Sequence, residues 1–329
     1  MIEPLQRILV IGGGGFIGSH LCRRWLDRGA SVDILVHPET ALDRLPEPGG
    51  RLTVHRAKLD DRAAIERCLA SASADIVYHL ATSTGHGSSR TAGGHPDDIE
   101  NLARLLEALS GARHTPHAFI RSGSIAEYGR GPLPFREEQQ EQPLNSYALM
   151  MTEAVRRADL YRSRLPFPVI TARLALAYGR GQSPAFLIPS LISRCLAGKP
   201  STIDNPNDRR DLIHVDDVVD ALRTIAEKAE HCPPILNICT GIAPTIREVA
   251  QFIRAMTGAS ARLLHFGEDR QEEGPLELRA SPHLMDSTCR WQAAISWRQG
   301  IAQTIEAFAR AASRAETTPA IRQHAAETS

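Results

Sequence analysis

The 329-residue chain carries 38 basic and 38 acidic side chains, so its formal net charge is zero. With 42% hydrophobic and 23% charged residues it has the composition of a globular protein, long enough for one large domain or two coupled ones. A neutral charge balance does not predict binding to nucleic acid or to an anionic membrane surface. The six cysteines lack C-x-x-C spacing, so we expect neither a metal site nor a disulfide framework. The sequence shows no signal peptide and no long apolar run, so we expect a cytoplasmic protein without a membrane segment.

Apolar runs and helical patterns alternate along most of the chain. Strands are expected at 7–11, 31–36, 51–59, 75–81, 117–124, 167–179 and 235–241. Helical patterns cover 16–28, 61–72, 97–112, the segment around Tyr147, and 245–258. Strands that alternate with helices of this length indicate βαβ units, and strands that are apolar throughout are buried on both faces. The sequence therefore predicts an α/β fold, a Rossmann-type doubly wound parallel sheet with a smaller C-terminal lobe.

The pattern loosens after residue 178, where prolines and a polar turn interrupt it. We expect residues 1–178 and 213–240 to form the dinucleotide-binding domain, and 179–212 and 241–312 to form a substrate-binding lobe. Residues 313–329 are polar and show no apolar pattern, so they are expected to be a disordered tail.

A glycine-rich loop joins the first expected strand to the first helix. The stretch "IGGGGFIGSH" places Gly12, Gly15 and Gly18 at three-residue intervals. Glycines there allow a tight turn and a close approach of backbone to a pyrophosphate, and the helix N-terminus supplies amide donors to the phosphates. The position of the loop between a strand and a helix favours dinucleotide binding over a glycine-rich turn without a ligand.

The end of the second strand leaves the choice of dinucleotide open. An acidic residue there would bind the adenosine ribose and favour NAD. This chain has Val36, His37 and Pro38 instead, and the next basic residue is Arg44. His37 is either a cofactor contact or an exposed turn residue, and both NAD and NADP remain open as cofactors.

Four motifs in order resemble the extended short-chain dehydrogenase/reductase family. They are the glycine loop, "HLA" at 79–81, "SGSIAEYG" at 122–129, and Tyr147 in "NSYALMMTEA". The later segments "RLALAYGRGQ" and "RRDLIHVDDVVDAL" are similar to the nucleotide-sugar epimerase, dehydratase and reductase branch. The resemblance covers roughly residues 7–308 and implies a nucleotide-sugar substrate and an NAD(P) cofactor. Relatives commonly pair through the helices that here hold Asn101 and Tyr147, which implies a homodimer.

The resemblance also implies a role for each matching residue. Tyr147 would exchange a proton with a sugar hydroxyl or ketone, and Ser124 would hydrogen-bond the same oxygen. Arg210 would bind the substrate diphosphate. For Asn101 and Asp60, ordinary helix or turn polarity stays an alternative. The implied cofactor contacts are Gly12, Gly15, Phe16, Ile17, Gly18, His37, Asp60, Leu80, Ala81, Thr82, Asn101 and Tyr147.

Met151 departs from the family pattern. The family has a lysine four residues after the tyrosine, where its ammonium holds the nicotinamide ribose and lowers the tyrosine pKa from about 10. A methionine can do neither. Two alternatives to an active site are a Tyr147–Met151 packing pair on one helix face and a catalytically impaired homologue.

The residues after Ser124 narrow the reaction. Ile125 and Ala126 stand where the family's dehydratases carry an acid–base pair, and the decarboxylating and 3,5-epimerising relatives carry a glutamate or cysteine at position 126. The alternation of an extended segment would turn Glu127 away from that side. What remains is hydride chemistry at one carbon, either reduction of a keto group or C4-epimerisation.

The methionine favours reduction. Epimerisation begins with Tyr147 acting as a base, and ionising a phenol of pKa about 10 near neutral pH costs about 4 kcal/mol. Reduction needs a neutral phenol that gives up its proton. We therefore expect reduction of a keto group, as in a 4-keto-6-deoxy nucleotide sugar, with a C4-epimerase as the alternative.

Overall fold

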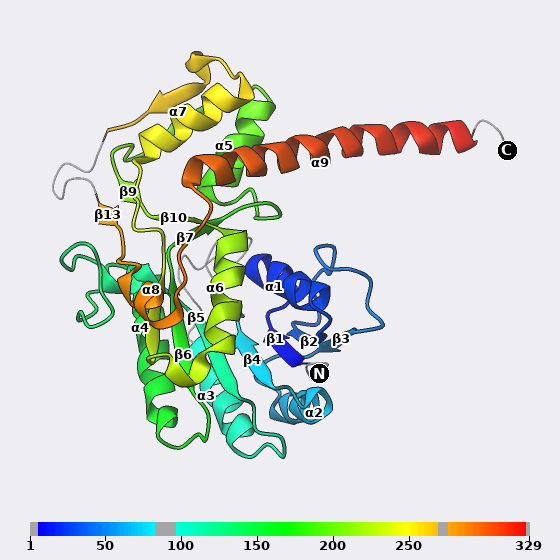
Figure 1. Cartoon of the computed structure of the whole chain (residues 1–329). Helices are drawn as coiled ribbons and strands as arrows, with labels where there is room; N and C mark the ends of the chain where they lie inside the picture. The colour runs from blue at the N-terminus through cyan, green and yellow to red at the C-terminus, as the bar shows by residue number, and fades with distance from the viewer. Residues whose placement is uncertain (1–5, 83–96, 269–275, 327–329) are drawn as a thin grey trace.

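Residues 6–82, 97–268 and 276–326 are described in the computed structural model (Figure 1). In these residues seven parallel strands form one sheet with the order β11-β6-β5-β4-β1-β2-β3. The strands are β1 (Arg7–Ile11), β2 (Ser31–Val36), β3 (Leu52–Arg56), β4 (Ile76–His79), β5 (Ala118–Ser124), β6 (Val169–Leu174) and β11 (Ile235–Ile238). The order 3-2-1-4-5-6 confirms the predicted Rossmann-type doubly wound sheet.

Helices cover both faces of the sheet (Figure 1). One face packs on α1 (Phe16–Asp27) and α6 (Val215–Glu227), and the other on α2 (Arg62–Ala72), α3 (Asp97–Ser110) and α4 (Ser146–Arg162). Successive residues of β1 point to opposite faces: Ile8 and Val10 enter the first core, and Leu9 and Ile11 enter the second. This double burial explains why the strands read as continuous apolar runs.

The predicted strand at 167–179 is two strands in the structure. β6 ends at Leu174, and β7 (Leu176–Tyr178) leaves the sheet to pair with β10 (Leu212–His214). The change of partner occurs at Ala175, whose amide still bonds to Ile238 of the sheet, whereas the Leu176 amide bonds to Asp211. The apolar run is continuous across this break, so the sequence does not reveal it.

The remaining elements lie outside the sheet. Two further short parallel pairs join β8 (Ser201–Ile203) to β12 (Leu264–Phe266) and β9 (Arg209–Arg210) to β13 (Glu277–Leu278). A third core gathers apolar residues of α5, α7 and α9. The helices are α5 (Leu187–Leu196), α7 (Ile246–Thr257), α8 (His283–Cys289) and α9 (Trp297–Ala326), with short 3-10 helices η1 (Ile125–Tyr128), η2 (Ala229–His231) and η3 (Ala261–Leu263). The predicted domain boundaries stay a prediction.

The C-terminal helix extends past residue 312. α9 continues to Ala326 and projects away from the rest of the molecule (Figure 1). Residues 313–326 include four alanines and two arginines, which have high helix propensity, although Pro319 lies among them. The predicted disorder of residues 313–329 stays a prediction.

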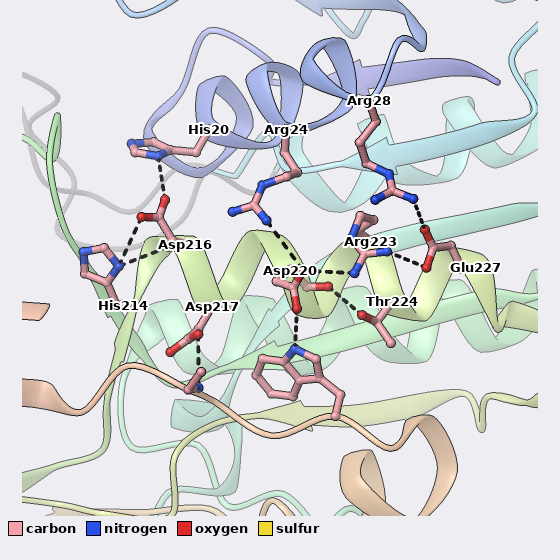
Figure 2. Close-up of polar contacts among 12 residues, drawn as sticks. His20, Arg24, Arg28, His214, Asp216, Asp217, Asp220, Arg223, Thr224 and Glu227 are labelled. Carbon is pink, nitrogen blue, oxygen red and sulfur yellow. Dashed lines mark hydrogen bonds and ion pairs between the residues drawn. The ribbon is translucent and has the colours of Figure 1, made fainter. Parts of the chain in front are cut away.

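Polar contacts join α6 to α1 and to the segment before α9 (Figure 2). Arg24 lies 3.6 Å from Asp220, and Arg28 lies 3.6 Å from Glu227. These pairs are partly exposed, so each contributes little to stability. Asp217 is different because it is buried, and its two carboxylate oxygens accept hydrogen bonds from backbone amides ahead of α9.

Asp217→Ala should destabilise the fold by roughly 2–4 kcal/mol, because two backbone amides, at Ala294 and Ile295, would lose their buried acceptor. Glu39→Ala is a matched control, since that carboxylate is 90% exposed and its loss should change stability by less than about 0.5 kcal/mol. Chemical denaturation of the three proteins measures both values. Equal stabilities would show that Asp217 does not anchor this segment.

Candidate active site

The glycine turn after β1 is packed against the end of β4. Gly12 has a φ of +86°, and a Cβ there would lie 2.7 Å from the Ala81 amide nitrogen. A Cβ on Gly18 would lie 2.3 Å from the Gly12 carbonyl oxygen. Both positions therefore require glycine. The turn brings Gly12, Gly15 and Gly18 together with Leu80 and Ala81, which the sequence also predicts as cofactor contacts.

The first turn of α1 suits a phosphate. Its N-cap residue is Gly15, which offers no side-chain hydrogen bond to the amides of the turn that Phe16 and Ile17 begin. Backbone amides at a helix N-terminus are the donors that a phosphate takes. The close packing at Gly12 and the uncapped helix start thus fit a dinucleotide pyrophosphate.

His37 and Asp60 lie at the carboxyl ends of β2 and β3, on the side of the sheet away from Tyr147. The His37 side chain is 50% exposed, and its Nδ1 accepts a hydrogen bond of 3.3 Å from the Glu39 amide. Asp60 is exposed in the turn after β3. Both keep their predicted cofactor roles only as predictions.

Arg56 at the end of β3 was missed by the sequence reasoning. Its guanidinium donates to the carbonyls of Pro38 at 2.7 Å and Thr40 at 3.0 Å, so it holds the turn after β2. Along the chain, the next basic residue after β2 is Arg44. β2 pairs in parallel with β3, and Val36 lies opposite Arg56. The neighbouring strand therefore places a basic residue beside the turn after β2.

Ser124 ends β5, and Tyr147 is the second residue of α4, whose N-cap is Asn145. The Ser124 hydroxyl lies close enough to the Tyr147 phenol to lower the pKa of the phenol. Burial raises the pKa of Tyr147 above its usual value; the Ser124 hydroxyl and the Arg121 charge oppose this rise, and the Glu127 charge adds to it. The predicted tyrosine–serine pair is therefore brought together, with a phenol that holds its proton at neutral pH.

Met151 lies one helical turn after Tyr147 and is 1% exposed. It packs at the wall of a cavity formed by α3, α4 and the ends of β4 and β5. The lining residues are His79, Ala81, Thr82, Asp98, Leu102, Arg121, Met150, Met151 and Ala154. The cavity thus joins two predicted cofactor residues, Ala81 and Thr82, to the position where the family carries its lysine.

Glu127 does not lie on an extended segment, and the expected alternation after Ser124 is wrong. Residues Ile125–Tyr128 form the 3-10 helix η1, which Ser124 and Glu127 close as a capping box. The Ser124 amide donates to Glu127 Oε1 at 2.7 Å, and the Ser124 hydroxyl accepts from the Ala126 amide at 3.2 Å. The signal was present in the sequence, because Ser-x-x-Glu is a capping-box pattern.

A buried ion pair holds Glu127 in place. The Arg173 side chain is fully buried, and its Nε donates to Glu127 Oε2 at 2.7 Å. Arg173 also pairs with Glu141 and lies 4.5 Å from the centre of the Tyr128 ring. The Tyr128 hydroxyl in turn donates to Asn237 Oδ1 at 2.9 Å. This network fixes η1 and, through it, the position of Ser124.

Asn101 and Arg210 lie on other elements. Asn101 sits on α3, and its Oδ1 accepts a hydrogen bond of 2.9 Å from Arg104. Arg210 is on β9, outside the sheet, where its guanidinium contacts Asp208 at 2.8 Å and the Leu276 carbonyl at 2.6 Å. The cofactor role of Asn101 and the diphosphate role of Arg210 remain predictions.

Within residues 6–82, 97–268 and 276–326, no three His, Cys, Asp or Glu side chains are grouped as a metal site would need. None of the helices in those ranges is both long enough and apolar enough to cross a bilayer. The cytoplasmic location stays a prediction.

His79 predicts a pH dependence of stability. Burial, with a smaller effect of the Arg121 charge, lowers its pKa from 6.5 to about 3. Below pH 6.5 the His79 imidazole is protonated in the unfolded chain but stays neutral in the folded chain. The fold therefore keeps its full stability above that pH and loses stability as the pH drops toward about 3. Between pH 6.5 and about pH 5 the loss should be roughly 2 kcal/mol.

The variant His79→Gln isolates this contribution because its side chain does not titrate. Denaturant unfolding of both proteins at about pH 7 and about pH 5 should give a smaller loss for the variant, by roughly 2 kcal/mol. Equal losses in the two proteins would show that His79 gains its proton freely in the fold.

The chain matches known proteins along most of its length. A sequence model of the NAD dependent epimerase/dehydratase family matches residues 8–239. The chain is 28% identical to the uncharacterized UDP-glucose epimerase YtcB of Bacillus subtilis, over 80% of this chain and 85% of that protein. It is 27% identical to the dTDP-6-deoxy-L-talose 4-dehydrogenase (NAD(P)(+)) of Kitasatospora kifunensis, over 78% of this chain and 81% of that protein.

A solved structure shares the fold and carries a cofactor. MoeE5 in complex with UDP-glucuronic acid and NAD has a TM-score of 0.79 and 29% identity, covering 92% of this chain and 99% of that one. The family match includes the glycine turn, Ser124 and Tyr147. The chain therefore belongs to the NAD dependent epimerase/dehydratase family, and it is an enzyme of the extended short-chain dehydrogenase/reductase type.

Proposed function

We propose that the protein reduces a keto group of a nucleotide-diphosphate sugar, such as a 4-keto-6-deoxy sugar, with Tyr147 as the proton donor. The observation that carries this proposal is the environment of the phenol. Burial raises the pKa of Tyr147, and the residue one turn along the helix is the uncharged Met151. A phenol in this setting is protonated near neutral pH, which is the state that a proton donor needs.

The glycine turn would hold the cofactor, with backbone amides at the start of α1 on its pyrophosphate. Bound NAD(P)H supplies the hydride. Ser124 would hold the substrate oxygen next to Tyr147, which transfers its proton to that oxygen. His37 and Arg56 flank the turn after β2, where NAD and NADP differ, and both cofactors remain open.

The residues after Ser124 support single-carbon chemistry. Ile125 is 3% exposed and Ala126 has no ionisable group, so neither serves as the acid or base of a dehydration. Glu127 is fully buried and bound to Arg173 and to the Ser124 amide. This carboxylate is therefore engaged in structure and does not reach a substrate.

A C4-epimerase is the second candidate. It is supported by the relatives, several of which are described as UDP-glucose 4-epimerases, and by the Arg121 charge that opposes the rise of the Tyr147 pKa. Epimerisation would begin with Tyr147 as a base. The third possibility is a protein that binds cofactor but turns over no substrate, and the reduction assay separates it from the other two.

We further propose a homodimer formed through α3 and α4. Two leucines on α4, Leu149 and Leu160, are 51% and 59% exposed although they are apolar. Exposed apolar side chains on α4 suit burial against a second copy.

Reduction is tested with a 4-keto-6-deoxy nucleotide sugar and added NADH or NADPH, followed by the loss of reduced-nicotinamide absorbance. Tyr147→Phe should lower the rate by about a hundredfold or more because the proton donor is gone. Tyr161→Phe is the matched control, since Tyr161 is on the same helix and bonds to Glu107 instead. No absorbance loss with any nucleotide variant would contradict the reductase proposal, and sugar conversion without added cofactor would indicate the epimerase.

Gly18→Ala tests the cofactor site. The new Cβ would press on the Gly12 carbonyl, so the turn must shift and NAD(P)H affinity should fall about tenfold or more. In Gly111→Ala the nearest atom would be 3.9 Å away, which makes this variant the control. Titration of cofactor fluorescence measures both affinities, and unchanged binding in Gly18→Ala would place the cofactor elsewhere.

A further inference from the structure

Arg121 is a buried arginine on β5, and its side chain lies on the same face of that strand as Gly123. Its side chain is 2% exposed, and one guanidinium nitrogen donates to Thr171 Oγ1 at a long 3.4 Å. Its Nε has no hydrogen-bond partner among the described residues. No carboxylate in the described part of the chain forms an ion pair with it. A buried charge without such a partner is costly, so its position calls for a function.

The neighbouring carboxylates are already engaged. Glu127 accepts from Arg173 and from the Ser124 amide, and Glu141 pairs with Arg173. Glu127 therefore acts on Arg121 through its field without bonding to it. The free face of the guanidinium borders the cavity instead.

This cavity is the one that Met151 lines. Ala81 and Thr82 reach it from the end of β4, and Met151 reaches it from α4, one turn after Tyr147. Arg121 and Tyr147 also act on each other electrostatically, each favouring the charged form of the other. The positive charge near the phenol thus comes from a strand, while the helix position beside it is apolar.

We propose that the Arg121 guanidinium is the positive charge that stabilises the Tyr147 phenolate during turnover, in place of a cation at position 151. The inference rests on the proposed function in that Tyr147 gives its proton to the substrate oxygen. The O–H bond of the phenol breaks, the proton moves to that oxygen, and a partly buried phenolate remains. A nearby positive charge lowers the cost of this anion. The same charge serves the reverse transfer, so the inference holds for reduction and for epimerisation.

Other charged groups surround the pair and would share in its titration. Glu127 from η1 opposes ionisation of Tyr147, and the Ser124 hydroxyl favours it. The titratable and charged groups around Arg121 are Glu127 from η1, Arg173 from β6, Arg162 from α4, His79 from β4 and Asp98 from α3. The competing explanation is structural: Arg121 would only balance the net negative charge of Glu127, Arg173 and Glu141.

The test is titration of the Tyr147 phenol in the protein without substrate. Its signal is the tyrosinate ultraviolet absorbance of each protein minus that of the same protein carrying Tyr147→Phe. Arg121→Met should raise the pKa of Tyr147 by about 1 unit or more, since a charge in contact typically shifts a pKa by that amount. Arg121→Lys should retain most of the parental value. Arg156→Met, which removes an exposed charge from α4, is the control and should leave the pKa unchanged.

The double variant Arg121→Met with Met151→Lys sharpens the test. Its new ammonium enters the cavity from the helix and should bring the pKa of Tyr147 back toward the parental value. A charge-balancing role at Glu127 and Arg173 does not predict this rescue. If Arg121→Met and the double variant both fail to fold, as judged by circular dichroism and melting, Arg121 serves the fold and the proposal is overturned.

Activity separates this inference from the proposed function. If the pKa of Tyr147 shifts in Arg121→Met but no keto sugar is reduced by the parent, the proposed function fails and the inference stands. If the parent is active, Arg121→Met should lower kcat about tenfold or more and move the alkaline limb of its pH profile. A folded Arg121→Met with an unmoved pKa and an unmoved profile would overturn the inference.

Discussion

The buried ion pair between Arg173 and Glu127 organises the carboxyl end of β5. Arg173 comes from β6, so the pair ties two central strands together at the level of the site. Glu127 uses its second oxygen to accept from the Ser124 amide, which turns the chain into η1 at once after the strand. Removing Arg173 would leave the buried Glu127 carboxylate without its ion-pair partner, a change that costs several kcal/mol in proteins. The position of Ser124 therefore depends on two residues that are engaged with each other in the core.

A second constraint brings the cofactor half of the site to the same place. β4 lies between β1 and β5, so its end faces both the glycine turn and Tyr147. Gly12 contacts the backbone at Ala81, and the next residue, Thr82, borders the cavity with Met151. Parallel strands end at one edge of the sheet, so residues far apart in sequence converge there. The short segment after His79 is the link between the two halves.

Much of this arrangement is readable from the sequence, for physical reasons that differ by residue. The glycine turn and the βαβ alternation are local patterns, so they predict the sheet and the first helix. Ser124 and Tyr147 are found because their motifs occur in order. The predicted extended segment at Glu127 is wrong, because the Ser-x-x-Glu spacing there indicates the capping box that closes η1. Arg121 carried no signal, because its burial depends on residues from β4, α3 and α4 that only the fold brings together.

The exchange of a helix lysine for a strand arginine has a physical logic. The cavity wall at positions 151 and 154 is apolar, and burial there, next to the Arg121 charge, disfavours a second cation at position 151. An arginine keeps its charge under the same burial because its guanidinium is the stronger base. Its place on a central strand also fixes it better than a long side chain on a helix surface. Once the charge comes from β5, position 151 is free to be apolar, and methionine fills an irregular space well. The apolar Met151 and the buried Arg121 are therefore linked: the positive charge beside Tyr147 comes from β5 and not from α4.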